Sequence, residues 1–144
     1  MTTHHTIPTT VRALTVRQPW AWAIAHAGKD VENRWWATRW RGQLLIHAGK
    51  TQPTHWEQQV LLSHTGVLPA TYALGAIVAV AQLAGICPPH RCQCFSPWAE
   101  PGRYHWQLRD IRPLAQPIPC SGARGLWRPA PATQQAVHAA LQAT

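Results

Sequence analysis

The segment GAIVAVAQLAGI, residues 75–86, constrains the fold more than any other part of the chain. It contains the longest uninterrupted apolar run, Ala76 to Ala81, and it is rich in β-branched residues. The run is strand-sized and far short of the roughly 20 residues that a membrane-spanning helix needs. Apolar residues at both alternating positions predict a central strand that is buried on both faces.

The rest of the chain supplies more strands and a few helices. Polar and apolar residues alternate most cleanly in RYHWQLRDIRPL, where Tyr104, Trp106 and Leu108 share one face. Strands are also expected at 13–18, 30–36 and 42–48, with a turn around 38–42 joining the last two, and a short extended piece at 117–120. Helices are expected at 19–28, at 53–64 beginning at Pro53, and at 131–143, and residues 87–102 form an irregular insertion. Strands with few helical crossovers predict an α+β fold, a small mixed β-barrel decorated by about three helices.

Length and composition predict one domain at residues 11–144, preceded by a loose polar tail at residues 1–10. No hydrophobic leader precedes the first strand, and four cysteines, three of them clustered, fit a reducing compartment better than a disulfide scaffold. We therefore expect a cytoplasmic protein with no membrane association, and a monomer.

The charge of the chain points to a polyanionic partner. Thirteen basic residues face five acidic ones, and eleven of the thirteen are arginine. Arginine binds phosphate in a bidentate manner and stacks on bases. A GC-rich genome would explain part of the arginine bias but not the shortage of acids. Nine tryptophans exceed what a core needs, so some should lie at a surface where bases stack. Nucleic acid is the simplest partner.

Five motifs recur in the order typical of one family: LTVRQPWAWAI, GKDVENR, RGQLLIHA, GAIVAVAQL and WQLRDIRPL followed by PIPCSGARGLW. From residue 13 to about 128 the sequence resembles the ASCH (activating signal cointegrator homology) domain of the PUA-like superfamily. The resemblance implies a PUA-like β-barrel with a positively charged cleft between barrel and helix. It also implies binding of RNA or DNA, single-stranded or at a duplex end, in RNA metabolism or transcription regulation.

In this family the GxKxxExR segment lies at the cleft, and here it corresponds to Gly28, Lys29, Glu32 and Arg34. Some bacterial relatives are hydrolases, and their amidohydrolase group uses a lysine with a threonine nucleophile three positions later. This chain has Glu32 at that position, which favours binding over acetylcytidine hydrolysis. A ribonuclease-like or nucleoside hydrolase that uses Lys29 as acid or base is the alternative function, with His47 or Tyr104 as conceivable helpers.

Strand geometry predicts how these side chains point. If residues 30–36 are extended, Lys29 and Glu32 face opposite sides, whereas Glu32 and Arg34 share a face. The adjacent Trp35 and Trp36 then point in opposite directions, one into the core and one outward, and the sequence leaves open which is which.

Three further segments complete the predicted nucleic-acid-binding set. Arg17 and Gln18 precede a helix whose free N–H groups suit an anion, although Gln18 fits a capping role equally well. The turn at residues 39–41 interleaves cations with an indole, and the loop SGARGLW offers backbone N–H groups to a phosphate. For Trp40 and Trp127, packing against the barrel is the alternative to a contact with nucleic acid. The full set is Arg17, Gln18, Trp20, Lys29, Glu32, Arg34, Trp35, Arg39, Trp40, Arg41, Lys50, Arg124 and Trp127.

A cysteine-rich stretch invites comparison with zinc sites. Cys87, His90, Cys92 and Cys94 have the spacing C-x2-H-x-C-x-C, which lacks the two separated ligand pairs of structural zinc sites. We therefore expect no metal and no cofactor.

Overall fold

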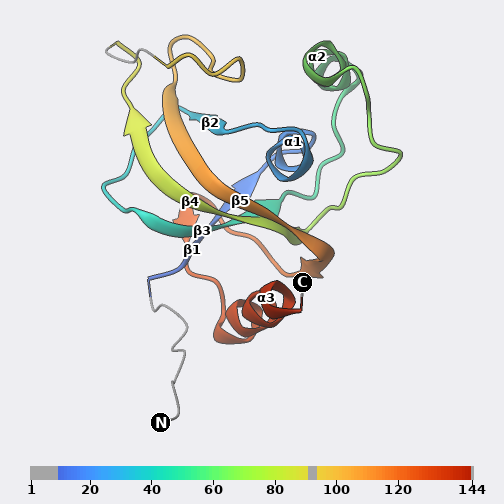
Figure 1. Cartoon of the computed structure of the whole chain (residues 1–144), viewed down its shortest axis with the longest axis vertical. Coiled ribbons are helices and arrows are strands. Elements are labelled where there is room, and N and C mark those ends of the chain that lie inside the picture. Colours follow the sequence, from blue (N-terminus) through green and yellow to red (C-terminus); the bar gives the residue numbers. More distant parts are fainter. Residues whose placement is uncertain (1–9, 91–93, 144) are drawn as a thin grey trace.

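The computed structural model describes residues 10–90 and 94–143, so the predicted N-terminal tail lies outside the described residues except for Thr10. Six strands form one mixed sheet in the order β2-β5-β4-β3-β1-β6, with β1 parallel to β3 and the other neighbours antiparallel. The elements are β1 Arg12–Val16, α1 Trp20–His26, β2 Val31–Arg34, β3 Gly42–Ala48, α2 His55–Thr65, β4 Ala76–Cys87, β5 Tyr104–Pro119, β6 Leu126–Trp127 and α3 Pro131–Gln142. Figure 1 shows their arrangement.

The long apolar run is a central strand, as predicted. Residues 76–81 of β4 are all buried, and β4 pairs with β3 on one side and β5 on the other. Register shifts interrupt both pairings, and such bulges increase local twist and bend a strand. The sheet curls accordingly into a half-barrel, visible in the sweep of β4 and β5 (Figure 1). This confirms the predicted α+β, PUA-like fold with three helices.

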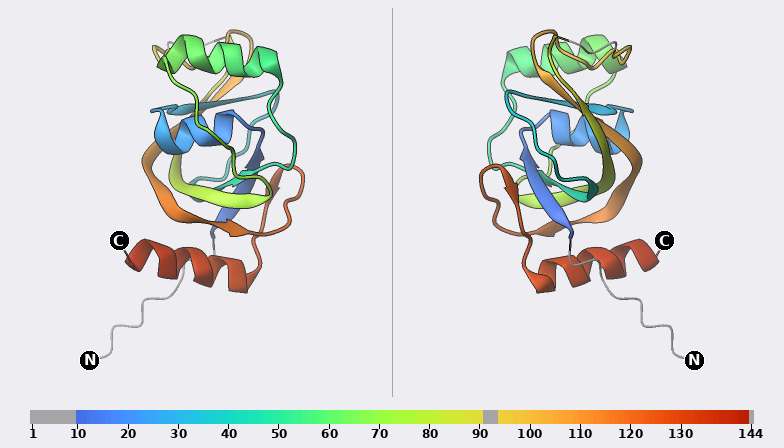
Figure 2. Two further views of the ribbon diagram at one scale, coloured as in Figure 1. Left: turned by 90° about the vertical axis from the view of Figure 1, so that its right-hand side faces the viewer. Right: turned by 90° about the vertical axis from the view of Figure 1, so that its left-hand side faces the viewer.

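Helices cover the two faces of the curled sheet (Figure 2). Inside the curve, α1 packs Ala21 and Ile24 against Leu14, Leu44 and other residues of the strands. On the outer face, Val137 of α3 joins a second cluster with Leu45, Ile77 and Leu114. Residues 76–81 of β4 are thus covered on both sides, which explains why this run contains only apolar residues.

The two strands that residues 35–41 connect do not pair with each other, because β2 pairs with β5 at one edge while β3 lies between β4 and β1. Two local predictions were wrong. The second helix begins at His55 rather than at Pro53, since Thr54 is its N-cap and forms a capping box with Glu57. The piece at 117–120 is not separate, because β5 runs unbroken from Tyr104 to Pro119.

Helix α2 lies at one end of the molecule, next to α1, and α3 lies toward the opposite end (Figures 1 and 2). The single fully buried residue of α2 is Leu61, which packs against Ala23 of α1 and Trp98. Within the described part of the chain, no helix is long and apolar enough to cross a membrane.

Candidate functional site

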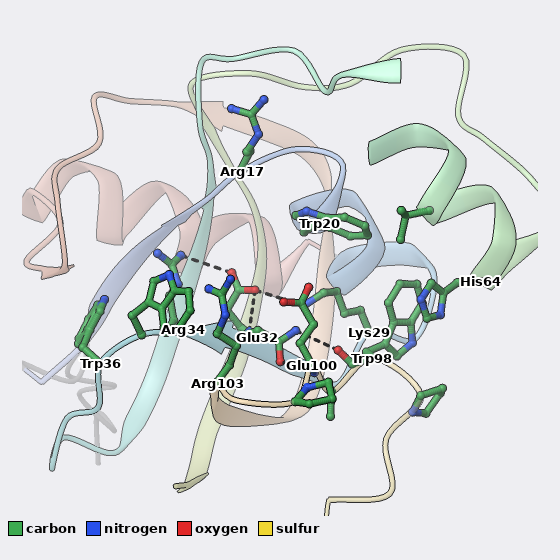
Figure 3. Close-up of a pocket in the computed structure, with 16 residues that line it drawn as sticks. Arg17, Trp20, Lys29, Glu32, Arg34, Trp36, His64, Trp98, Glu100 and Arg103 are labelled. Atoms are coloured by element: carbon green, nitrogen blue, oxygen red, sulfur yellow. Dashed lines mark hydrogen bonds and ion pairs between the residues drawn. The ribbon is translucent and has the colours of Figure 1, made fainter. Parts of the chain in front are cut away.

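A pocket of about 520 Å³ opens between β2, the ends of α1 and α2, and the loop before β5. Its volume lies within the range of small-ligand sites. Figure 3 shows the side chains that line it. They are Arg17, Trp20, Lys29, Glu32, Asn33, Arg34, Trp35, Trp36, Val60, His64, Pro97, Trp98, Ala99, Glu100, Pro101 and Arg103. The lining thus combines four tryptophans with four lysine or arginine side chains and two carboxylates.

Lys29 and Glu32 form an ion pair at the base of this pocket. Gly28 lies two residues after the end of α1 with a left-handed φ of 73°, and Lys29 donates its backbone N–H to Ala23 O. Its ammonium then donates to the Val31 carbonyl and to Glu32 Oε1, 3.2 Å away. Both side chains are buried, with 4% and 9% of their surface exposed. The prediction that they face opposite sides was wrong, because β2 starts at Val31 and strand alternation does not extend to Lys29.

Glu32 also contacts Arg34, and these two share a face as predicted. Arg34 Nη2 lies 3.3 Å from Glu32 Oε2 and 2.6 Å from the carbonyl oxygen of Thr15, to which it donates. The backbone N–H of Asn33 donates to Glu32 Oε1. One carboxylate therefore holds two cations, and we call Lys29, Glu32 and Arg34 the pocket floor (Figure 3).

The adjacent tryptophans of the pocket separate into one packed ring and one exposed ring. Trp36 packs edge-on against the fully buried Trp106, with 4.8 Å between ring centroids, and its carbonyl accepts the Trp106 indole N–H. Trp35 is 71% exposed. The Arg103 guanidinium lies over the Trp35 ring, 3.4 Å from its centroid. The exposed member of the pair is therefore Trp35.

Helix α2 borders the pocket through one ion pair and one aromatic contact. Arg17 donates two hydrogen bonds to the Glu57 carboxylate, at 2.7 and 3.0 Å, and this hydrogen bonding lowers the pKa of Glu57. In the last turn of the helix, His64 stacks on Trp98 with 4.2 Å between ring centroids. These contacts, with buried Leu61, attach α2 to the rim.

The loop before β5 supplies residues that the sequence did not single out. Asn33 Nδ2 donates to Trp98 O, and its Oδ1 accepts the backbone N–H of Glu100, so the edge strand fixes the loop. The loop in turn places Trp98, Glu100 and Arg103 on the pocket. This stretch was predicted only as an irregular insertion, and no local motif indicates where it folds back.

The structure brings six of the predicted binding residues together around the pocket. They are Arg17, Trp20, Lys29, Glu32, Arg34 and Trp35. The other seven do not line it. Gln18 is buried and both ends of its amide are used, by the Ala73 carbonyl and the Trp22 N–H, which matches its capping alternative. The Trp40 indole donates to Thr10 O and its ring packs on the core.

The remaining predicted residues lie at other places on the molecule. Arg41 donates to carbonyls of its own turn, and the side chains of Arg39, Lys50 and Arg124 are exposed. Trp127 packs edge-on against His47 and joins the second core cluster.

The conceivable catalytic helpers and the metal candidates within the described residues do not line the pocket. His47 is buried between the Thr15 hydroxyl and the Cys120 carbonyl, and Tyr104 packs on the core. Of the weak metal candidates, Cys92 lies outside the described residues. Among the described residues, no group of three His, Cys, Asp or Glu could hold a metal ion.

The curled mixed sheet with α1 inside it fits the α+β, PUA-like fold. The family model of the ASCH domain matches residues 14–117, and the chain belongs to this family. The solved ASCH protein of Zymomonas mobilis is 15% identical with a TM-score of 0.54, covering 90% of this chain and 95% of that one. Two mutant forms of it, each 16% identical with a TM-score of 0.54, cover 90% and 91% of this chain and 97% and 96% of theirs. These likenesses support the fold; no curated protein matches the sequence.

Proposed function

We propose that this ASCH domain binds nucleic acid and that the pocket receives a base of RNA or DNA, from a single strand or a duplex end. One observation carries the proposal: four tryptophans and four cationic side chains line a single pocket above a buried ion-pair network. Flat aromatic rings stack on bases, and cations neutralise the phosphates that connect them. The pocket thus presents the two kinds of group that a nucleotide requires.

The state of each cation identifies the one best suited to contact a phosphate. Lys29 and Arg34 are committed to Glu32 on the floor, and Arg17 is paired with Glu57. Among the described residues, no hydrogen bond or ion pair involves the Arg103 guanidinium. Its N–H groups remain available at the rim, so Arg103 is the phosphate-binding residue that we propose.

The contacts of Lys29 support binding over hydrolysis. Its ammonium donates to Glu32 and to a backbone carbonyl. These hydrogen bonds hold the residues of the pocket floor in place. Glu32 occupies the position at which the amidohydrolase relatives carry threonine, and it lies between two cations. The pair is therefore better arranged to shape a pocket than to attack a bond.

A salt titration tests the proposal. Anisotropy of a labelled single-stranded RNA, measured between about 50 and 300 mM salt, should show affinity that falls steeply with salt. Arg103→Ala should weaken binding and lower the slope of log K against log salt by about 0.7, the value for one lost contact to a single strand. Arg109→Ala, an exposed arginine of β5 outside the pocket, is the matched control and should change the affinity less.

Two outcomes would contradict the proposal: binding that does not respond to salt, or equal effects of the two arginine substitutions. The same labelled RNA is run on a gel after incubation, with and without divalent metal. Cleavage that depends on Lys29 would favour the hydrolase alternative.

A further inference from the structure

Trp35 and Arg103 form a flat, two-layered unit at the rim of the pocket. The guanidinium carbon of Arg103 lies 3.4 Å from the centroid of the Trp35 ring, which is stacking distance. Both residues line the pocket, yet 71% of Trp35 is exposed. The guanidinium covers one face of the indole. Because the residue is still 71% exposed, much of the rest of the ring is in contact with solvent.

The backbone beneath Trp35 is held on both sides. On one side, Arg34 is tied to Glu32 and to the Thr15 carbonyl. On the other, Trp36 packs on the buried Trp106 and accepts its indole N–H. An exposed ring on a fixed backbone, already stacked on one face, has little conformational freedom left to lose. Preorganisation of this kind reduces the entropic cost of binding.

We propose that this unit, the Trp35–Arg103 platform, is a second base-binding site, so that the ligand is at least two consecutive nucleotides. The inference rests on the proposed function: one base enters the pocket, and its neighbour stacks on the platform outside it. Guanidinium and indole are both flat π systems on which a base stacks without regard to its identity. The edge of the guanidinium retains its N–H groups, which donate to the phosphate between the two nucleotides.

The platform predicts a gain in affinity from the second nucleotide. Calorimetric titration compares the four ribonucleoside 5′-monophosphates with the four matching 5′-phosphorylated homodinucleotides. For at least one base, the wild-type protein should bind the dinucleotide roughly 5- to 150-fold more tightly, the range for one stacked base. Trp35→Ala should remove most of that gain, measured within the variant as the ratio of its dinucleotide affinity to its monophosphate affinity.

Two control variants isolate the aromatic ring. Trp35→Phe retains a flat ring and should keep part of the gain. Trp56→Ala removes a tryptophan of α2 that is equally exposed, at 74%, but does not line the pocket, and it should keep the whole gain. Circular dichroism and thermal unfolding verify that all three variants are folded, which is expected because neither ring is buried.

The outcomes separate the two proposals. Tight binding of a monophosphate with no gain from the second nucleotide would overturn the platform and leave the proposed function standing. A gain that survives in Trp35→Ala, or that is lost equally in Trp56→Ala, would also overturn the platform. Failure of every nucleotide and of the longer RNA to bind would overturn both.

Discussion

The floor and the rim of the pocket use the same kinds of residue in opposite ways. On the floor, Lys29 and Glu32 are buried and every charge has a partner. On the rim, Trp35 is exposed and Arg103 makes only a stacking contact among the described residues. The floor also connects α1 to β2 and, through the Thr15 carbonyl, to β1. The rim belongs to loops and to the loosely attached α2.

This contrast separates residues that shape the pocket from residues available to a ligand. Removing one member of a buried ion pair leaves an uncompensated charge away from water, which costs far more than the loss of an exposed contact. Floor substitutions should therefore act mainly on stability, and rim substitutions mainly on binding.

The largest effect is expected at Glu32. In Glu32→Ala, Lys29 and Arg34 face each other without their shared carboxylate. We expect a loss of about 3–5 kcal/mol in the free energy of unfolding, the range for a broken buried pair. Lys29→Met should cost less, because Glu32 keeps Arg34. Urea denaturation monitored by tryptophan fluorescence measures both.

Glu100→Ala is the matched control for this prediction. Glu100 lines the same pocket but is exposed, and the contacts that fix its position are made by its backbone. Its substitution should change stability by less than about 0.5 kcal/mol. If Glu32→Ala and Glu100→Ala cost the same, the distinction between floor and rim fails.

The sequence predicted the floor better than the rim, because the floor is encoded locally. Lys29, Glu32 and Arg34 fall within one short motif, and the alternation of a strand correctly placed Glu32 beside Arg34. The relation of Lys29 to Glu32 was mispredicted, since the alternation rule applies only inside the strand and Lys29 precedes it.

The rim depends on contacts between distant parts of the chain. Arg103 meets Trp35 only because β5 pairs with β2, a pairing that joins residues about 70 positions apart. His64 and Trp98 meet through the packing of α2 against the insertion. By contrast, a central strand and a mixed barrel with three helices were predictable, because apolar periodicity and the order of motifs report them directly.

The Gly-rich loop that was predicted to cradle a phosphate is exposed along residues 121–125, yet Gly122 lies close against the buried His47. A Cβ atom on Gly122 would lie 2.6 Å from His47 Cε1 and 2.7 Å from the Thr15 hydroxyl oxygen, too close for either atom. Gly122→Ala should therefore cost about 1–3 kcal/mol, the usual range for overpacking, in thermal and urea unfolding.

Gly49→Ala provides the comparison for that substitution. A Cβ atom there would make an ordinary contact of 3.5 Å with the Thr15 methyl group, so we expect a change below about 1 kcal/mol. If both substitutions lower the free energy of unfolding equally, the loop around Gly122 must shift to accommodate the added methyl group. The loop would then be adaptable, as we expect of the rim and not of the floor.

The smallest effect is expected where α2 joins the rim, at the Arg17–Glu57 ion pair. The hydrogen bond from Arg17 holds the pKa of Glu57 below its ordinary value, so the folded state binds this proton less readily than the unfolded state. The stabilisation is therefore present above the unfolded pKa, near 4.5, and is lost as the pH falls through the lower folded value.

Glu57→Gln tests this ion pair, because it retains the capping-box geometry and removes the charge. Because Arg17 is 44% exposed, the variant should lose only about 0.5–1 kcal/mol at pH 7. Urea unfolding from pH 7 downward should show the difference from the wild type shrinking as the pH falls below 4.5. A difference that does not shrink with falling pH would mean that the carboxylate acts through something other than its charge.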